Sequence, residues 1–191
     1  MTRQNNFVLL IAVVVAICGF LVRANAQEST AVPKAASVVR PQTYVSLEPV
    51  PRGKEFQIAV VAEIARGFHM NSNHPSDAYL IPTTLAPQLP TGFKLLDTNY
   101  PEGQNQKFSF SPDKPLNVYS GSVTIKLRVL AETDAAMGAN SIPMTLRYQA
   151  CNDSTCLPPV KLPVEAKIVV SGANTKAQAA HPEIFLSKSP K

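Results

Sequence analysis

Between residues 54 and 170 the chain repeatedly alternates apolar and polar side chains with a period of two. The apolar members of the four longest sets are Phe56, Ile58, Val60, Ala62 and Ile64; Val123, Ile125, Leu127 and Val129; Met144, Leu146, Tyr148 and Ala150; and Val164, Ala166, Ile168 and Val170. Because successive side chains of a strand point to opposite faces of a sheet, this period predicts strands with one face in a core. Shorter candidate strands are 44–50, 80–85 and 93–96.

The segments between these predicted strands are rich in turn-forming residues. The chain has 17 prolines and 8 glycines, and no segment has the pattern of an amphipathic helix. About seven short strands within about 130 residues predict an all-β fold, an immunoglobulin-like antiparallel β-sandwich, with a small barrel as the alternative. The chain contains no tryptophan, so the buried tryptophan typical of immunoglobulin domains is absent.

The two ends of the chain differ from this central part. Arg3, the apolar run 7–22 and the small-x-small sequence Ala24-Asn25-Ala26 predict a signal peptide at 1–26, with a retained membrane anchor as the alternative. The run is slightly short of the roughly 20 residues that cross a bilayer as a helix. We expect a flexible leader at 27–42, one domain at 43–170 and a flexible tail at 171–191.

Composition narrows the possible functions. The net charge is +5, but the basic residues are scattered and form no stripe with interleaved aromatic residues, so we expect no nucleic-acid partner. An exported chain enters an oxidising compartment, where two thiols can pair. We therefore expect a protein outside the cytoplasm, in contact with a membrane only if the N-terminal helix is retained.

The segment YQACNDSTCLPP at 148–159 holds the two cysteines that remain when residues 1–26 are removed. Cys151 and Cys156 lie at a turn between two predicted strands. If they face each other as a non-hydrogen-bonded pair, their Cα atoms are about 4.5 Å apart, which permits a disulfide. So small a ring gains only about 2 kcal/mol from loop closure, and an exposed disulfide is readily reduced.

The residues alone leave three uses of this pair open. It is a redox-active pair, a structural disulfide in a non-catalytic binding module, or part of a copper(I) site with ligands from the segment 68–75, which contains His69, Met70 and His74. The two histidines are more typical of loop or packing positions. No Lys, Arg or His is next to the pair in sequence, and Asp153 would raise the pKa of a nearby thiol.

Several segments in the same order resemble a known family. YQACNDSTCLPP resembles the cysteine loop of the N-terminal periplasmic domain of the thiol:disulfide interchange protein DsbD. The upstream segments GFHMNSNHPSDAYLIPTTL, YPEG and KFSFSPDKPLNVYSGSVTIKL extend the resemblance over residues 43–170. The cysteine loop is one residue shorter than in the best-known members, and the chain ends after the predicted sandwich.

This resemblance implies an immunoglobulin-like, protein-disulfide reductase-like electron-transfer domain without cofactor or metal. It would pass reducing equivalents to thioredoxin-like periplasmic proteins, including those of cytochrome c biogenesis, and would receive them through a separate membrane electron conduit of DsbD type. By the same resemblance Cys156 forms mixed disulfides and Cys151 resolves them. Phe108 or Phe110, within a cap loop at 107–114, would shield the pair. Tyr148 is a candidate supporting residue, although a strand tyrosine ordinarily packs in the core.

Overall fold

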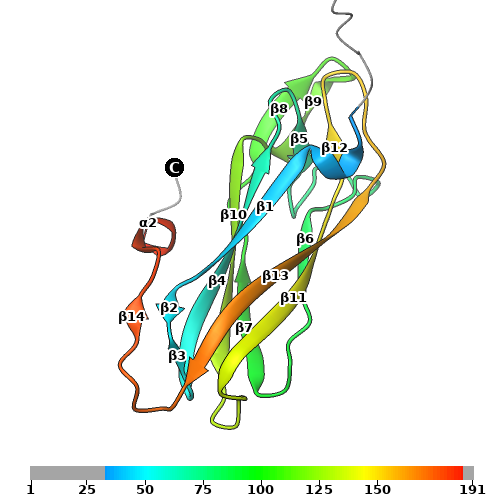
Figure 1. The fold of residues 1–191 in the computed structure, drawn as a ribbon. Coiled ribbons are helices and arrows are strands. Elements are labelled where there is room, and N and C mark those ends of the chain that lie inside the picture. Colours follow the sequence, from blue (N-terminus) through cyan, green and yellow to red (C-terminus); the bar gives the residue numbers. More distant parts are fainter. Residues whose placement is uncertain (1–32, 187–191) are drawn as a thin grey trace, which may run out of the picture. The chain divides into compact units, whose positions relative to one another are not determined.

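The computed structural model describes residues 33–186, which form strands with very little helix (Figure 1). The predicted signal peptide at 1–26 lies outside the described residues, as do 27–32 of the predicted leader and 187–191 of the predicted tail. Within 33–186, no helix has the length and apolar character needed to cross a membrane.

Two four-stranded sheets build the body of the domain. The first has the order β1-β4-β10-β7 and is antiparallel throughout. Its strands are β1 (Val39–Val45), β4 (Lys54–Ile64), β10 (Ser122–Ala131) and β7 (Phe93–Asn99). The second has the order β3-β13-β11-β6, in which only the short β3–β13 pairing is parallel. Its strands are β3 (Val50–Pro51), β13 (Val160–Ser171), β11 (Gly138–Tyr148) and β6 (Thr84–Pro87).

The apolar faces of these two sheets meet in one core. The buried cluster takes its members from both sheets, including Ile58, Ile125 and Leu127 from the first and Ile142 and Leu146 from the second. These are the residues that the period-two alternation places on one face of each strand. The predicted immunoglobulin-like antiparallel β-sandwich is therefore confirmed, and the four long alternating sets lie in β4, β10, β11 with the following β12, and β13.

A third, smaller sheet lies at one end of the sandwich (Figure 1). Its order is β12-β5-β9-β8, with β12 (Ala150–Cys151), β5 (His69–Asn71), β9 (Ser111–Tyr119) and β8 (Gln104–Phe108). It has a small apolar cluster of its own, made by Phe108, Leu116 and Val118, with Leu80 packed against it. This sheet joins the first cysteine to the β8–β9 hairpin.

Strands extend beyond both predicted boundaries of the domain. Val39–Gln42, expected in the flexible leader, belong to β1, an edge strand in which Pro41 is tolerated because one side of the strand needs no partner. In the expected tail, β14 (Gln178–Ala179) pairs with β2 (Leu47–Glu48), and the one-turn helix α2 (Pro182–Phe185) follows. Short polar segments such as β14 have no period of their own, so only their pairing partner reveals them.

Candidate functional site

The two cysteines form a disulfide across a tight hairpin at the end of the sandwich. Cys151 and Cys156 are paired as an antiparallel bridge, and their Cα atoms are 3.9 Å apart. Main-chain hydrogen bonds flank the pair on both sides, from Leu157 N to Ala150 O at 2.8 Å and from Asn152 N to Thr155 O at 2.9 Å. The cysteines therefore occupy the predicted non-hydrogen-bonded position, in which side chains approach most closely.

Asn152 shapes the turn between the cysteines. Its Oδ1 accepts hydrogen bonds from the main-chain N–H groups of Ser154 at 2.9 Å and Thr155 at 2.8 Å, and from the Ser154 hydroxyl at 3.1 Å. An asparagine side chain that bonds the backbone two and three residues ahead stabilises a local turn. The four residues between the cysteines thus form a turn largely by their own side-chain chemistry.

The two sulfur-bearing residues differ in exposure. Cys151 is only 2% exposed, and its strand β12 pairs with β5. Cys156 is exposed, and the chain returns to the core only at the buried Leu157. An approaching protein therefore meets Cys156 before Cys151.

His69 lies directly opposite Cys151 in the β5–β12 pairing. Its side chain is buried, and its Nε2 has no hydrogen-bond partner. Burial lowers the pKa of His69 below its ordinary value, while the negative charge of Asp153 acts in the opposite direction. No histidine is next to the pair in the sequence, but a separate strand brings His69 to the position opposite Cys151.

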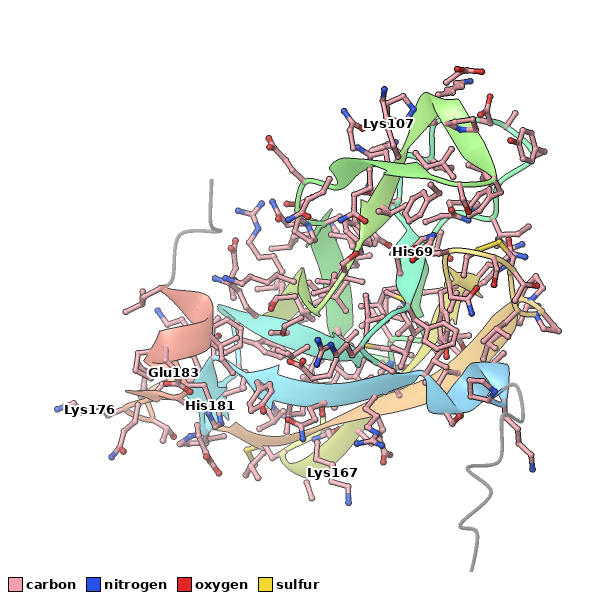
Figure 2. The ribbon with its side chains drawn as sticks, turned by 90° about the horizontal axis from the view of Figure 1, so that it is seen from above. His69, Lys107, Lys167, Lys176, His181 and Glu183 are labelled. Atoms are coloured by element: carbon pink, nitrogen blue, oxygen red, sulfur yellow. A yellow bond between two sulfur atoms is a disulfide. The ribbon has the colours of Figure 1, made fainter. Side chains whose placement is uncertain are left out.

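Two aromatic rings of the β8–β9 hairpin continue from His69. The Phe108 ring stacks on the imidazole with 4.0 Å between ring centroids, and the Phe110 ring stacks on Phe108 with 5.4 Å between centroids. In Figure 2 His69 lies between the green β8–β9 hairpin and the yellow segment with the disulfide. The segment 107–114, predicted as a cap loop, thus forms the tip of a hairpin, and both candidate phenylalanines belong to one stack.

A hydrogen bond also joins the hairpin tip to the cysteine turn. In the sequence Ser109 lies between the two phenylalanines, and its Oγ donates a hydrogen bond to the main-chain oxygen of Asp153 at 2.6 Å. Asp153, His69 and Phe108 also line a surface pocket of about 440 Å³, together with Arg66. The hairpin therefore contacts both the strand beside Cys151 and the turn that leads to Cys156.

The hydroxyl of Tyr148 makes its hydrogen bond outside the cysteine hairpin. The residue is fully buried in the main core, and its hydroxyl donates to the main-chain oxygen of Ala35 at 3.0 Å. Burial raises the pKa of Tyr148 to about 12. This side chain ties the segment before β1 to β11, which matches the packing alternative given for a strand tyrosine.

The residues considered for copper(I) are spread over different environments. Met70 is buried in the main core, where β5 pairs with β9, whereas His74 is exposed. Among residues 33–186, no three His, Cys, Asp or Glu side chains are grouped so that they could hold a metal ion.

Fold and site together define a class: an immunoglobulin-like β-sandwich with a disulfide hairpin at one end, beneath an aromatic-bearing hairpin. A protein-family model described as "Thiol:disulfide interchange protein DsbD, N-terminal" matches residues 35–167. The chain belongs to this family.

Solved structures that resemble the chain do so at low sequence identity. The Neisseria meningitidis DsbD N-terminal domain in the reduced form has 16% identity and a TM-score of 0.41, covering 75% of this chain and 90% of that chain. The same domain, in a structure of its complex with the PilB N-terminal domain, gives 16% identity, a TM-score of 0.39, and coverage of 64% and 80%. The Escherichia coli fimbrial subunit AggA has 7% identity and a TM-score of 0.31, covering 73% of this chain and all of the other. No curated protein matches the chain in sequence.

Proposed function

We propose that this domain passes reducing equivalents to partner proteins in the periplasm through the Cys151–Cys156 pair. Thiol:disulfide exchange is the chemistry of the family to which the chain belongs, and the pair forms a disulfide in which Cys156 is exposed. The observation that supports the division of roles is the difference in exposure, with Cys156 at the surface and Cys151 buried. Cys156 is the thiol that attacks a partner, and Cys151 is the thiol that resolves the complex.

The proposed reaction has two steps. In the reduced domain, the Cys156 thiolate attacks one sulfur of a partner disulfide, which forms a mixed disulfide and releases the other partner sulfur as a thiolate. Cys151 then loses its proton and attacks Cys156, so that the Cys151–Cys156 bond forms and the bond to the partner breaks. The two partner sulfurs take up two protons, and the domain has lost the same two protons and two electrons.

The β8–β9 hairpin is the proposed cap of this site. Phe108 is 7% exposed and Phe110 is 46% exposed, so the inner ring shields the buried side of the pair and the outer ring is available to a partner. The Ser109–Asp153 hydrogen bond holds the hairpin against the cysteine turn. A partner that displaces the hairpin gains access to both cysteines.

The proposed partners are thioredoxin-like proteins. Support comes from the structure in which the related Neisseria domain is in complex with the PilB N-terminal domain. Electrons would reach the domain from a separate membrane conduit of DsbD type, and cytochrome c biogenesis is one pathway that would consume them. Export by the predicted signal peptide at 1–26 places the domain in the periplasm.

Trapping of covalent partners tests the proposal. In Cys151→Ser, Cys156 still attacks but nothing resolves the mixed disulfide, so partner complexes accumulate on non-reducing gels of periplasmic extracts. In the matched control Cys156→Ser, the remaining cysteine of the pair, Cys151, is buried, and complexes should be far fewer. Equal trapping by the two variants would contradict the division of roles.

Redox titration separates this function from a structural disulfide in a binding module. A pair that exchanges electrons equilibrates with reduced thioredoxin while the domain stays folded. A structural disulfide in the folded domain would resist the same reductant, and reduction would then follow only from unfolding. The second result would contradict the proposed function.

A further inference from the structure

His69 has a buried nitrogen with nothing to bond to. The residue is 4% exposed, and its Nε2 has no hydrogen-bond partner in the folded domain. Most buried polar side-chain atoms in proteins have at least one hydrogen-bond partner, so an exception needs a physical explanation. The Phe108 ring, stacked at 4.0 Å, covers one face of the imidazole and provides no hydrogen-bond acceptor in its plane.

The register of the small sheet places Cys151 opposite His69. Cys151 and His69 are directly opposite each other in the antiparallel β12–β5 pairing. Residues in that relationship point to the same face of a sheet, with Cβ atoms about 4.5–5.5 Å apart. Figure 2 shows His69 on the side of the hairpin that faces the segment with the disulfide.

Reduction of the disulfide changes what Cys151 offers to its surroundings. In the disulfide, its sulfur carries no proton. In the reduced domain the same sulfur becomes a thiol, a weak donor, at a position that is only 2% exposed. Reduction therefore creates a buried donor on the residue opposite His69, whose Nε2 is buried and has no hydrogen-bond partner.

We propose that His69 is the proton acceptor for the Cys151 thiol in the resolving step, an inference that rests on the proposed function. In the mixed disulfide, His69 Nε2 takes the proton of Cys151 as its sulfur attacks Cys156. The Cys151–Cys156 bond forms, the bond between Cys156 and the partner breaks, and the electron pair leaves with the partner sulfur. The imidazolium then gives its proton to the departing thiolate or to water.

The charges around His69 suit a proton acceptor. Burial lowers the pKa of His69, which keeps the imidazole neutral and able to accept at neutral pH, and the Asp153 carboxylate favours the imidazolium once it forms. Arg66 lines the same pocket as His69 and Asp153. Lys107 precedes Phe108 in the hairpin and is exposed.

The two steps can be timed separately with the chromogenic disulfide 5,5′-dithiobis(2-nitrobenzoate). The reduced full chain with Cys18→Ser, in which Cys151 and Cys156 are the remaining thiols, should release thionitrobenzoate in two phases. The first phase is attack by Cys156, and its rate depends on reagent concentration. The second phase is attack by Cys151 on the mixed disulfide, and its rate does not.

Two substitutions of His69 isolate proton acceptance from packing. His69→Phe keeps a ring against Phe108, and His69→Gln keeps a polar side chain that cannot take the proton. Both should leave the first phase within twofold of the wild type and slow the second phase at neutral pH by about 100-fold, a common effect of losing a general base. The matched control His74→Gln, an exposed histidine in the same segment, should change neither phase.

The pH dependence of the second-phase rate distinguishes proton acceptance from a purely structural role of His69, because a structural role would not change its shape. In the wild type the second-phase rate should level off near neutral pH, because neutral His69 accepts the proton. In both His69 variants the rate should instead rise about tenfold per pH unit towards the pKa of a free thiol, about 8.5.

The outcomes distinguish this inference from the proposed function. If the wild type shows no reaction in the folded state, thiol exchange itself fails, whatever His69 does. If both phases occur and the second is unchanged in His69→Phe, the role of His69 is overturned. Equal slowing of both phases, together with a lower melting temperature, would mean that His69 acts only in packing, which also overturns it.

Discussion

Ser109 Oγ donates a hydrogen bond to the main-chain oxygen of Asp153, 44 residues further along the chain, at 2.6 Å. The donor lies at the tip of the β8–β9 hairpin and the acceptor lies between the two cysteines. This bond joins the hairpin to the cysteine turn, and the His69–Phe108–Phe110 stack joins the hairpin to β5, the strand paired with Cys151. In the proposed function, access to the pair depends on both.

Removal of the hydroxyl in Ser109→Ala should loosen the hairpin without unfolding the domain. An exposed hydrogen bond contributes about 1 kcal/mol at most, so the disulfide should be reduced up to about fivefold faster by dithiothreitol while the melting temperature changes little. The measurement is the rate of thiol appearance in the folded domain. Ser111→Ala is the matched control, because the Ser111 hydroxyl bonds to Lys114 within the hairpin, at 2.7 Å. Equal acceleration in both variants would show that the Ser109–Asp153 bond has no special role.

The two stacked phenylalanines should differ in their effect on stability. Phe108 is buried with Leu116 and Val118, so Phe108→Ala should lower the free energy of unfolding by about 3 kcal/mol through lost burial and a new cavity. Phe110 is largely at the surface, and Phe110→Ala should cost less than about 1 kcal/mol. Urea denaturation of the oxidised domain measures both values.

The same pair of variants tests the shielding role. Phe108→Ala should accelerate reduction of the disulfide by dithiothreitol several-fold, and Phe110→Ala should accelerate it less. The rate is measured without urea, where both variants are folded. If Phe110→Ala gave the larger acceleration, the outer ring would be the shield and the inner ring only a core residue.

The sequence predicts the sandwich well because its long strands obey one simple rule. In β4 and β10 every second side chain enters the core. The apolar alternation from Phe56 to Ile64, and that from Val123 to Val129, therefore identifies both the strand and its buried face. Asn152 likewise marks the turn at the cysteines, because its side chain bonds only to neighbours in the sequence.

The surroundings of the cysteines could not be predicted in the same way. β5 has three residues, too few for a period, and its polar members His69 and Asn71 read as loop residues although both are buried. Their burial depends on pairing with β12 and β9, which are far away along the chain. The Ser109–Asp153 hydrogen bond could not be predicted either, because the sequence around one residue does not indicate the other as its partner.

Burial of His69 should make stability depend on pH in the acid range. Its pKa is lowered in the folded domain, so the unfolded chain binds a proton first as the pH falls below about 6.5. The free energy of unfolding therefore decreases as the pH falls from about 6.5 towards the lowered pKa of His69 in the folded state. The decrease stops once His69 is protonated in the folded state as well. His69→Phe should lack this component, while the exposed His74→Gln should keep it. Urea denaturation of the oxidised domain at about pH 7.5 and about pH 5 gives the comparison; an unchanged pH dependence in His69→Phe would contradict the burial of a neutral imidazole.

Tyr148 should produce the corresponding effect in the alkaline range. Burial raises its pKa to about 12 in the folded domain, whereas a tyrosine in the unfolded chain ionises near pH 10. Above that pH the unfolded state releases a proton that the folded state keeps, so stability should fall by up to about 2 kcal/mol between roughly pH 10 and pH 12. Tyr148→Phe should remove this loss but cost about 1 kcal/mol at neutral pH, because the hydrogen bond to Ala35 is no longer made. Tyr79→Phe is the matched control, since Tyr79 is exposed, and it should follow the wild type at both ends of the range. If Tyr148→Phe lost stability with rising pH as steeply as the wild type, the buried hydroxyl would not be the group responsible.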